Sequence, residues 1–375
     1  MSDDEIELLR ASLRRFVQRE ILPNIDRWEE EGQFPGDLYR QAGEAGFLGL
    51  GFAEEDGGMG EDPLAVMAMT EELMRCGSGG LVASLGSLGI GLPPIARWGS
   101  AALKKRVMPE VLRGEKIIAL AVTEPGGGSD VAHLQTRARR EGDEYVVSGQ
   151  KTFITSGCRA DYLTVAVRTG EPGSGGISLL LIETDRAGLT RSAPLRKMGW
   201  WASDTAELFF DELRVPADQL IGPENGGFYV LMSNFQMERL SLAVMAAASA
   251  DMALQASLEY AQQREAFGRK IASFQVLKHK LAEMATQVAV CRQYNLQVAR
   301  NLRAGVAQVM EVSMAKNFAT SVCDRVTYDA VQIFGGAGYM RGTLVERLYR
   351  DARILSIGGG TYEIMNELIA RQLGL

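Results

Sequence analysis

The spacing of apolar residues divides the chain into three segments, and the first of them has a helical period. Between Asp3 and about Gly114, apolar side chains recur every three to four positions, as in Ile6, Leu9, Leu13 and Phe16. That spacing is typical of the buried face of an α-helix. Prolines and a Gly-rich turn, EEDGGMGEDP, interrupt the period. The pattern therefore predicts several helices of ordinary length.

The second segment, from about Ile118 to Pro223, has a different pattern. It contains short β-branched or alternating runs separated by Gly, Pro and Asp turns, namely YVVSGQKTFIT, YLTVAV, ISLLLIE and AELFFDELRV. Runs of this length and composition predict strands, and their spacing favours an antiparallel sheet or barrel.

From Phe228 to Leu375 the helical period returns in longer runs: Glu238 to Arg264, Phe274 to Ala304 and Val309 to Phe334. An Ala-rich stretch, AVMAAASADMAL, allows close approach of helices and favours a bundle. Helices, then strands, then helices argue against an alternating βαβ sheet and a Rossmann fold. We predict an α+β protein with a helical domain at residues 1–117, an antiparallel β-barrel at 118–225 and a four-helix bundle at 226–375.

Composition and charge narrow the class of protein. The chain has 375 residues, 46% hydrophobic and 23% charged, which is ordinary for a globular enzyme and disfavours disorder. A net charge of −7 would repel a phosphate backbone, so we expect no nucleic-acid partner. The four cysteines lie far apart without ligand spacing, and only two histidines are present. We therefore expect no metal site and reduced, mostly buried thiols.

The amino-acid pattern also bears on location. The start, MSDDEIELLRASLRR, is acidic and lacks the basic and apolar regions of a secretory signal. No uninterrupted apolar stretch is long enough to predict a membrane span. We expect a cytoplasmic bacterial protein, or a mitochondrial matrix protein if a transit peptide was removed.

The first chemical motif is TEPGGGSD, from Thr123 to Asp130. Three consecutive glycines let backbone N–H groups converge on an anionic or polar group without interference from Cβ atoms. The motif lacks the spacing of a phosphate-binding P-loop. Alone, it also fits an ordinary Gly-rich loop between a helical and a strand domain.

Four further blocks follow in order: GQKTFITSGCRAD, KMGWWASDTAELFFDELRVP, YAQQREAFGRKIASFQ and QIFGGAGYMRGTLVERLYRDARILSIGGGTYEI. Helix or strand patterning does not produce five ordered matches of this kind. Together they make nearly the whole chain resemble the acyl-CoA dehydrogenase family.

The resemblance implies that FAD lies extended at a subunit interface. By that resemblance, Thr123, Ser129, Phe153 and Thr155 contact the flavin ring and the neighbouring diphosphate. The same resemblance implies that the diphosphate and adenosine are contacted from the adjacent subunit by Arg264, Phe267, Gln275, Gln332 and Gly336. It also implies that Thr361 and Glu363 close the adenosine side. Without the ordered blocks, the simpler interpretation is that Phe153 and Phe267 pack in the core. Arg264 would then be a solvent-exposed charged residue on the helical bundle.

Abstraction of the weakly acidic α-proton of a thioester requires a carboxylate base. Most of the resembled family has a Glu in the loop before the final Gly-Thr, where this chain has Gly359 in SIGGGTYEI. The long-chain and isovaleryl-type branches carry the base on the first bundle helix in an ERL sequence, present here as QMERL with Glu238. We predict Glu238 as the base; the alternative is a helix-start stabiliser or a surface pair with Arg239.

The remaining expectations also follow from the resemblance. The backbone N–H at Gly359 would donate to the thioester oxygen, and Ser129, Arg239 and Gly360 would contact the acyl-CoA substrate. Trp201 stands where the family often has a basic residue, which leaves its role open. Electrons would pass to an electron-transfer flavoprotein, and the assembly would be a homotetramer built from two dimers. The alternatives are an acyl-CoA oxidase and a non-catalytic FAD-binding relative.

Overall fold

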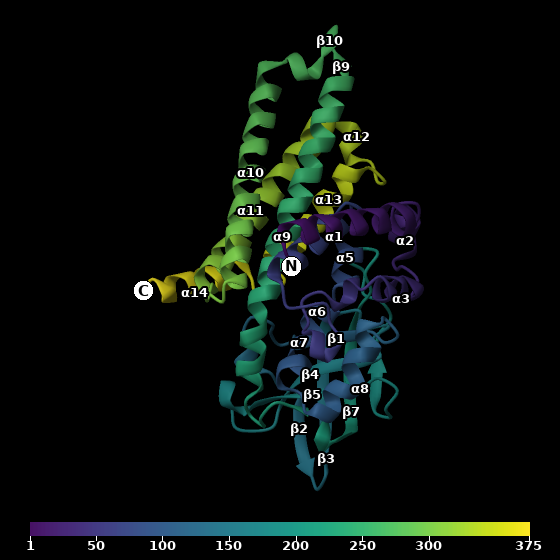
Figure 1. Ribbon diagram of the computed structural model, residues 1–375, viewed down its shortest axis with the longest axis vertical. Helices are drawn as coiled ribbons and strands as arrows, with labels where there is room; N and C mark the ends of the chain where they lie inside the picture. The colour runs from purple at the N-terminus through teal and green to yellow at the C-terminus, as the bar shows by residue number, and fades with distance from the viewer.

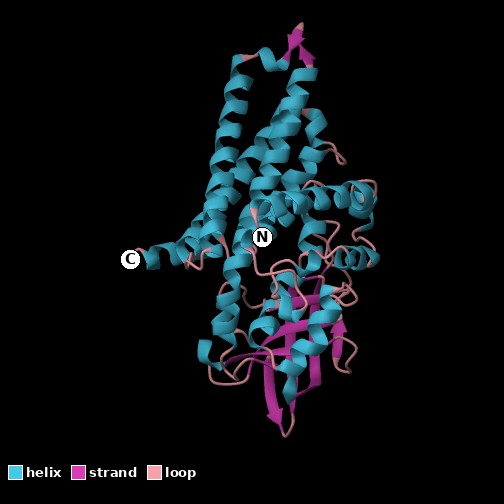
Figure 2. Cartoon of the chain, viewed as in Figure 1, coloured by secondary structure: helices cyan, strands magenta, loops and turns pink.

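The computed structural model describes all residues from Met1 to Leu375. Long helices lie at one end of the elongated molecule and the sheet at the other, with the N-terminal helices beside their junction (Figure 1). Strands are confined to the sheet end, apart from a small hairpin at the opposite tip (Figure 2). The structure therefore has the predicted order of helices, strands and helices.

Small polar side chains fix several helix starts in the N-terminal region. The side chains of Ser2, Asp62, Ser78 and Ser100 accept backbone N–H groups at the starts of α1, α4, α5 and α8, which satisfies donors that have no partner within the helix. The helices are α1 (Asp3–Phe16), α2 (Ile25–Glu31), α3 (Asp37–Glu44), α4 (Pro63–Met74), α5 (Gly79–Leu85), α6 (Leu88–Gly91), α7 (Pro93–Trp98) and α8 (Ala101–Leu112).

The middle of the chain forms one eight-stranded sheet with the order β6-β7-β3-β2-β4-β5-β8, and β1 pairs with β4. The pairings are antiparallel except that β4 runs parallel to β1 and, at one residue pair, to β2. Alternate side chains on the longer strands form a second apolar core. The strands are β1 (Ile118–Ala121), β2 (Arg137–Glu141), β3 (Glu144–Thr155), β4 (Tyr162–Arg168), β5 (Ile177–Glu183), β6 (Leu189–Arg191), β7 (Thr205–Pro216) and β8 (Leu220–Ile221).

Three long helices dominate the C-terminal region, and α9 packs against both α10 and α11. The shorter α13 packs against α9 and α11, and α14 packs against α11. A hairpin, β9 (Glu265–Ala266) with β10 (Arg269–Lys270), joins α9 to α10 at the tip. The helices are α9 (Gly227–Gln263), α10 (Gln275–Arg303), α11 (Val309–Phe334), α12 (Gly336–Tyr339), α13 (Leu344–Ala352) and α14 (Tyr362–Gln372).

By length and mean hydropathy, α9 could cross a membrane, which the sequence pattern did not indicate. However, 67% of its most apolar window is buried inside the fold. A long core helix satisfies the same criteria, and burial against α10 and α11 explains its apolar composition.

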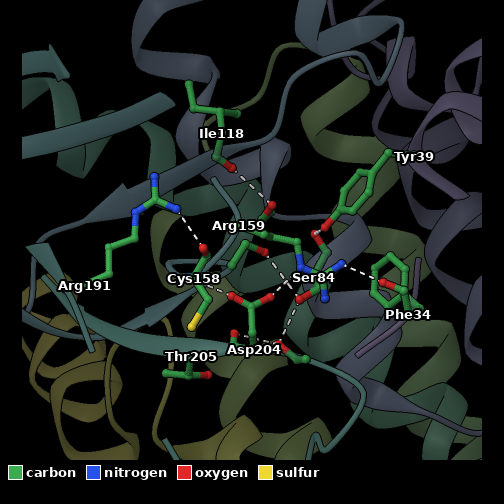
Figure 3. A network of polar contacts seen from close by, with 12 residues as sticks. Phe34, Tyr39, Ser84, Ile118, Cys158, Arg159, Arg191, Asp204 and Thr205 are labelled. Atoms are coloured by element: carbon green, nitrogen blue, oxygen red, sulfur yellow. Dashed lines mark hydrogen bonds and ion pairs between the residues drawn. The ribbon is translucent and has the colours of Figure 1, made fainter. Parts of the chain in front are cut away.

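A polar network joins the N-terminal helices to the sheet (Figure 3). The Arg159 guanidinium donates to Asp204 at 2.6 Å and to the Phe34 carbonyl at 2.9 Å. Asp204 also accepts the backbone N–H of Cys158 at 2.8 Å. These bonds tie the loop after β3 to the segment between α2 and α3, so the sheet is anchored to the helical region.

The cysteines are used as the sequence predicts. All four are free thiols, and Cys76, Cys291 and Cys323 are buried while Cys158 is half-buried. Burial raises the pKa of Cys76 and of Cys291 to about 12. These thiols therefore act as small apolar side chains.

Candidate active site

Helix α9 places Glu238 in its interior. The helix begins at Gly227, so Glu238 lies about three turns from its start. The residue is half-buried, but its Oε2 atom is buried and has no hydrogen-bond partner. One turn earlier, both polar atoms of the Asn234 amide are also buried without a partner. The side chain is therefore neither a helix-start stabiliser nor half of a surface ion pair.

The environment of Glu238 sets its ionisation near neutral pH. Burial raises the pKa of its carboxyl to about 7, against the opposing effect of the Arg239 and Lys316 charges. A carboxyl whose pKa lies near the working pH is a strong enough base to accept a proton, and about half of it is present as the carboxylate. This is the protonation behaviour that the predicted base requires.

A glycine turn lies directly against Glu238. A Cβ atom on Gly359 would stand 3.3 Å from Oε1 of Glu238 and 2.5 Å from Cδ1 of Leu242. Gly359 and Gly360 have φ values of +65° and +98°, which L side chains rarely adopt. The structure thus brings together the two sequence positions considered for the base, although they belong to α9 and to the loop before α14.

Two cationic side chains hold this turn by its carbonyl groups. Arg239 Nε donates to the Gly359 carbonyl at 3.2 Å, and Lys316 Nζ donates to the Gly360 carbonyl. Arg239 was predicted as a substrate contact, whereas Lys316 was not predicted at all. The signal that could have identified it is a lone lysine within the apolar run VSMAKNFATSV.

The predicted residues Thr361 and Glu363 lie at the start of α14, next to the glycine turn. The Thr361 side chain accepts the N–H of Ile364 at 3.3 Å and so caps the helix. Asn317 of α11 donates to the Tyr362 carbonyl and to Asn366, each at 2.9 Å. Glu363 is exposed. The start of α14 is therefore fixed against α11 beside the base.

A buried ion pair supports the TEPGGGSD loop. Lys151 of β3 donates to Glu124 at 2.8 Å, and Glu124 also accepts the N–H groups of Gln135 and Thr136. Burial alone would raise the pKa of Glu124, but the Lys151 charge and these hydrogen bonds lower it below its usual value. The loop therefore rests on an ionised carboxylate inside the protein.

The outer face of this loop is open and contains the other predicted flavin contacts. Gly126 to Ser129 are exposed, and Cβ atoms on Gly126 and Gly127 would meet nothing within 4 Å. Thr123 accepts the Thr152 N–H at 2.9 Å, beside Phe153, which is 68% exposed with φ +59°. Thr155 ends the same strand. An exposed aromatic ring beside an exposed glycine loop fits a flat, polar-edged ring system such as a flavin.

Three family models match the chain in order: the acyl-CoA dehydrogenase N-terminal domain over residues 3–115, the middle domain over 119–213 and the C-terminal domain over 225–374. The chain belongs to the acyl-CoA dehydrogenase family.

Individual relatives match over almost the full chain. The mouse (Mus musculus) mitochondrial long-chain specific acyl-CoA dehydrogenase is 40% identical, covering 98% of this chain and 86% of that protein. Mitochondrial isovaleryl-CoA dehydrogenase from Pongo abelii is 34% identical, covering 98% and 88%. The crystal structure of a probable acyl-CoA dehydrogenase from Mycobacterium abscessus is 52% identical, with a TM-score of 0.97 and complete coverage of both chains.

In this acyl-CoA dehydrogenase family member, the residues predicted to reach the diphosphate and adenosine from the adjacent subunit lie at the far tip of the helices. Arg264 ends α9, roughly 40 Å along the helix from Glu238. Phe267, in the β9–β10 hairpin, is 95% exposed with φ +51°. Gln275 starts α10, and stacking of Tyr260 on Phe334 with ring centroids 4.1 Å apart holds the end of α11 to α9. Gln332 and Gly336 are exposed there.

The structure also gives Trp201 a role. The guanidinium groups of Arg341 and Arg350 lie 4.1 Å and 3.6 Å from its ring centroid. Its indole N–H donates to the carbonyls of Lys197 and Met198. In this acyl-CoA dehydrogenase family member, Trp201 therefore joins the strand turn before β7 to the α12–α13 region through cation–π contacts.

Proposed function

We propose that the protein oxidises the Cα–Cβ bond of a fatty acyl-CoA, with a long, medium or branched acyl chain. The observation that carries the proposal is the buried, unpartnered Glu238 carboxyl beside the Gly359 turn. FAD is the cofactor and an electron-transfer flavoprotein the electron acceptor, both by membership of the family. The protein acts in the bacterial cytoplasm, or in the mitochondrial matrix if a transit peptide was removed.

Glu238 takes the α-proton of the thioester. Its carboxylate has no competing hydrogen bond, and its pKa near 7 matches a base that works at neutral pH. Negative charge then develops on the thioester oxygen, where the N–H of Gly359 would donate. Because Arg239 and Lys316 fix the carbonyls of this turn, its N–H groups are held in place before the substrate arrives.

The proposed acyl-CoA contacts lie around Glu238 and on the TEPGGGSD loop. Arg239 follows the base in the chain, and a Cβ atom on Gly360 would stand 3.9 Å from Nη2 of Arg239. The unpartnered amide of Asn234 leaves a donor and an acceptor for a polar ligand group. Ser129 lies on the open loop near the predicted cofactor position. When bound, FAD supplies the acceptor for the β-hydride. Thr123, Ser129, Phe153 and Thr155 would hold its ring side.

A second copy of the chain completes the cofactor site in this proposal. Arg264, Phe267, Gln275, Gln332 and Gly336 gather at the tip, too far from Glu238 to serve the same chain's site. Thr361 and Glu363 would close the adenosine side. Phe267 is 95% exposed at this tip, and in the proposed dimer it is buried against the other protomer. We propose a homotetramer built from two such dimers.

The function is tested with purified protein and a series of acyl-CoA thioesters. We expect a yellow protein whose flavin absorbance bleaches anaerobically with a preferred acyl-CoA, and turnover with an artificial electron acceptor. Fast reoxidation by oxygen would instead identify an acyl-CoA oxidase, and flavin binding without bleaching a non-catalytic relative. A protein that takes up no FAD on reconstitution would contradict the proposal.

Replacing Arg264 with methionine is expected to weaken FAD retention and dimer association together. One guanidinium would pair with a diphosphate bound mainly by the neighbouring protomer. FAD content after gel filtration and the sedimentation profile measure both effects. Arg292→Met is the control, because that arginine pairs with Asp251 midway along the helices. Unchanged FAD affinity in Arg264→Met would rule out this role.

A further inference from the structure

A lysine ammonium is buried close to the base without a carboxylate bonded to it. Lys316, on α11, is 0% exposed and donates its hydrogen bond to the Gly360 carbonyl. Burying an ammonium is costly, and a neutral amide could make the same hydrogen bond at lower cost. A charged side chain at this buried position therefore points to an electrostatic role.

The charges near Glu238 are few. Arg239, on the same helix, and Lys316, on the facing helix, both favour its ionised form. Arg353, before the glycine turn, is exposed and bonded to Ser356, and the α14 carboxylates Glu363 and Glu367 are also exposed. Lys316 is thus one of two buried cations acting on this carboxyl, and Arg239 is the other.

The Lys316 side chain also lies next to the backbone donor. Its Cε atom is 3.7 Å from the Cβ position of Gly359, so the stem packs under the turn while Nζ holds the next carbonyl. The adjacent Asn317 fixes the start of α14. One segment of α11 therefore sets the position of the whole loop that faces Glu238.

We infer that Lys316 is a positioning residue for proton abstraction, which holds the Gly359–Gly360 turn and keeps Glu238 ionised at neutral pH. This rests on the proposed role of Glu238. The sign follows from charge: removing a nearby cation destabilises the carboxylate, so the pKa of Glu238 rises. Because the base must be ionised, the acidic limb of the kcat/KM profile then moves to higher pH.

Three substitutions separate the charge of Lys316 from its hydrogen bond. Lys316→Gln keeps a donor for Gly360 and removes the charge, Lys316→Met removes both, and Lys316→Arg keeps both. We expect the Gln and Met variants to shift the acidic limb up by about one pH unit. Their kcat/KM should fall about fivefold at pH 7 and recover near pH 9. The Arg variant should keep the wild-type limb.

A second measurement needs neither turnover nor substrate. Infrared titration of the protonated carboxyl band that disappears in Glu238→Gln reports the pKa of Glu238 directly. The control is Lys280→Met, which removes a helix lysine bonded to Asp329, about 20 Å along α11 from Lys316. It should leave both the band and the limb unchanged.

The outcomes distinguish this inference from the proposed function. If Glu238→Gln retains normal turnover, Glu238 is not the base and the proposed function of that residue fails. If Glu238→Gln is inactive but Lys316→Gln and Lys316→Met leave the limb and the band in place, only the role of Lys316 is overturned. Should Lys316→Met fail to fold, the Gln and Arg variants still decide.

Discussion

Replacing Glu238 with glutamine is expected to lower turnover by about two to four orders of magnitude, the usual loss when a positioned general base is removed. Glutamine has nearly the same shape but cannot accept the α-proton. The Oε2 atom it replaces makes no hydrogen bond, so little structure depends on it. Folding, FAD content and acyl-CoA binding should stay near the wild-type level. Single-turnover flavin bleaching measures the chemical step.

The matched control for this substitution is Glu259→Gln on the same helix. Glu259 is exposed, so its loss should not change turnover. Near-normal bleaching by Glu238→Gln with its best substrate would remove Glu238 from the mechanism.

A carboxylate returned at Gly359 gives a stricter test in the Glu238→Gln background. A side chain at this position lies beside the place that Glu238 occupies, but φ is +65° and Leu242 Cδ1 would be 2.5 Å from Cβ. The left-handed backbone costs about 1–2 kcal/mol for a non-glycine residue. Gly359→Glu alone should therefore recover little activity. Adding Leu242→Ala should recover more, with altered chain preference; no recovery would show that the two positions do not serve one α-carbon.

The order of the secondary structure could be predicted from the sequence because apolar spacing directly reports helix and strand periods. The parallel pairing of β1 with β4 could not, since it joins strands separated by more than forty residues and depends on tertiary packing. The position at which α9 begins could not be predicted from the apolar spacing either. Its true first turn contains Gly227, which weakens helical propensity, so the strong period begins only near Glu238.

The site was predicted unevenly for a related reason. Glu238 and Gly359 belong to recognisable sequence blocks, and the structure places them in contact. Lys316 and Leu242 lie in apolar helical runs where one charged or one branched residue carries no chemical pattern of its own. Their importance depends on which residue of a distant loop they face. That information exists only after α9, α11 and the glycine turn have packed together.

The second large effect is expected in stability, from Lys151→Met. Lys151 is 0% exposed and pairs with Glu124, which also supports the Gly-rich loop. Burial lowers the pKa of Lys151 to about 8, so both partners are charged at neutral pH. Removing the ammonium leaves a buried carboxylate without its counter-charge. Breaking such a pair costs about 3–5 kcal/mol, which should appear as a lower urea midpoint and reduced FAD content.

Two companion variants show whether the uncompensated charge is the cause. In Lys151→Met/Glu124→Gln the carboxylate is gone, so part of the lost stability should return even though no ion pair exists. Lys116→Met removes an exposed lysine that pairs with Asp161 at 3.2 Å, and this surface pair should contribute less than about 1 kcal/mol.

The stability contributed by the buried pair depends on pH with a defined sign. The pKa of Glu124 is lowered in the folded protein, so the stability that its ionised form contributes is present at neutral pH and is lost as the pH falls through that value. The midpoints of wild type and Lys151→Met should therefore converge in acid. If Lys151→Met unfolds at the wild-type urea concentration at neutral pH, the ion pair does not support the loop.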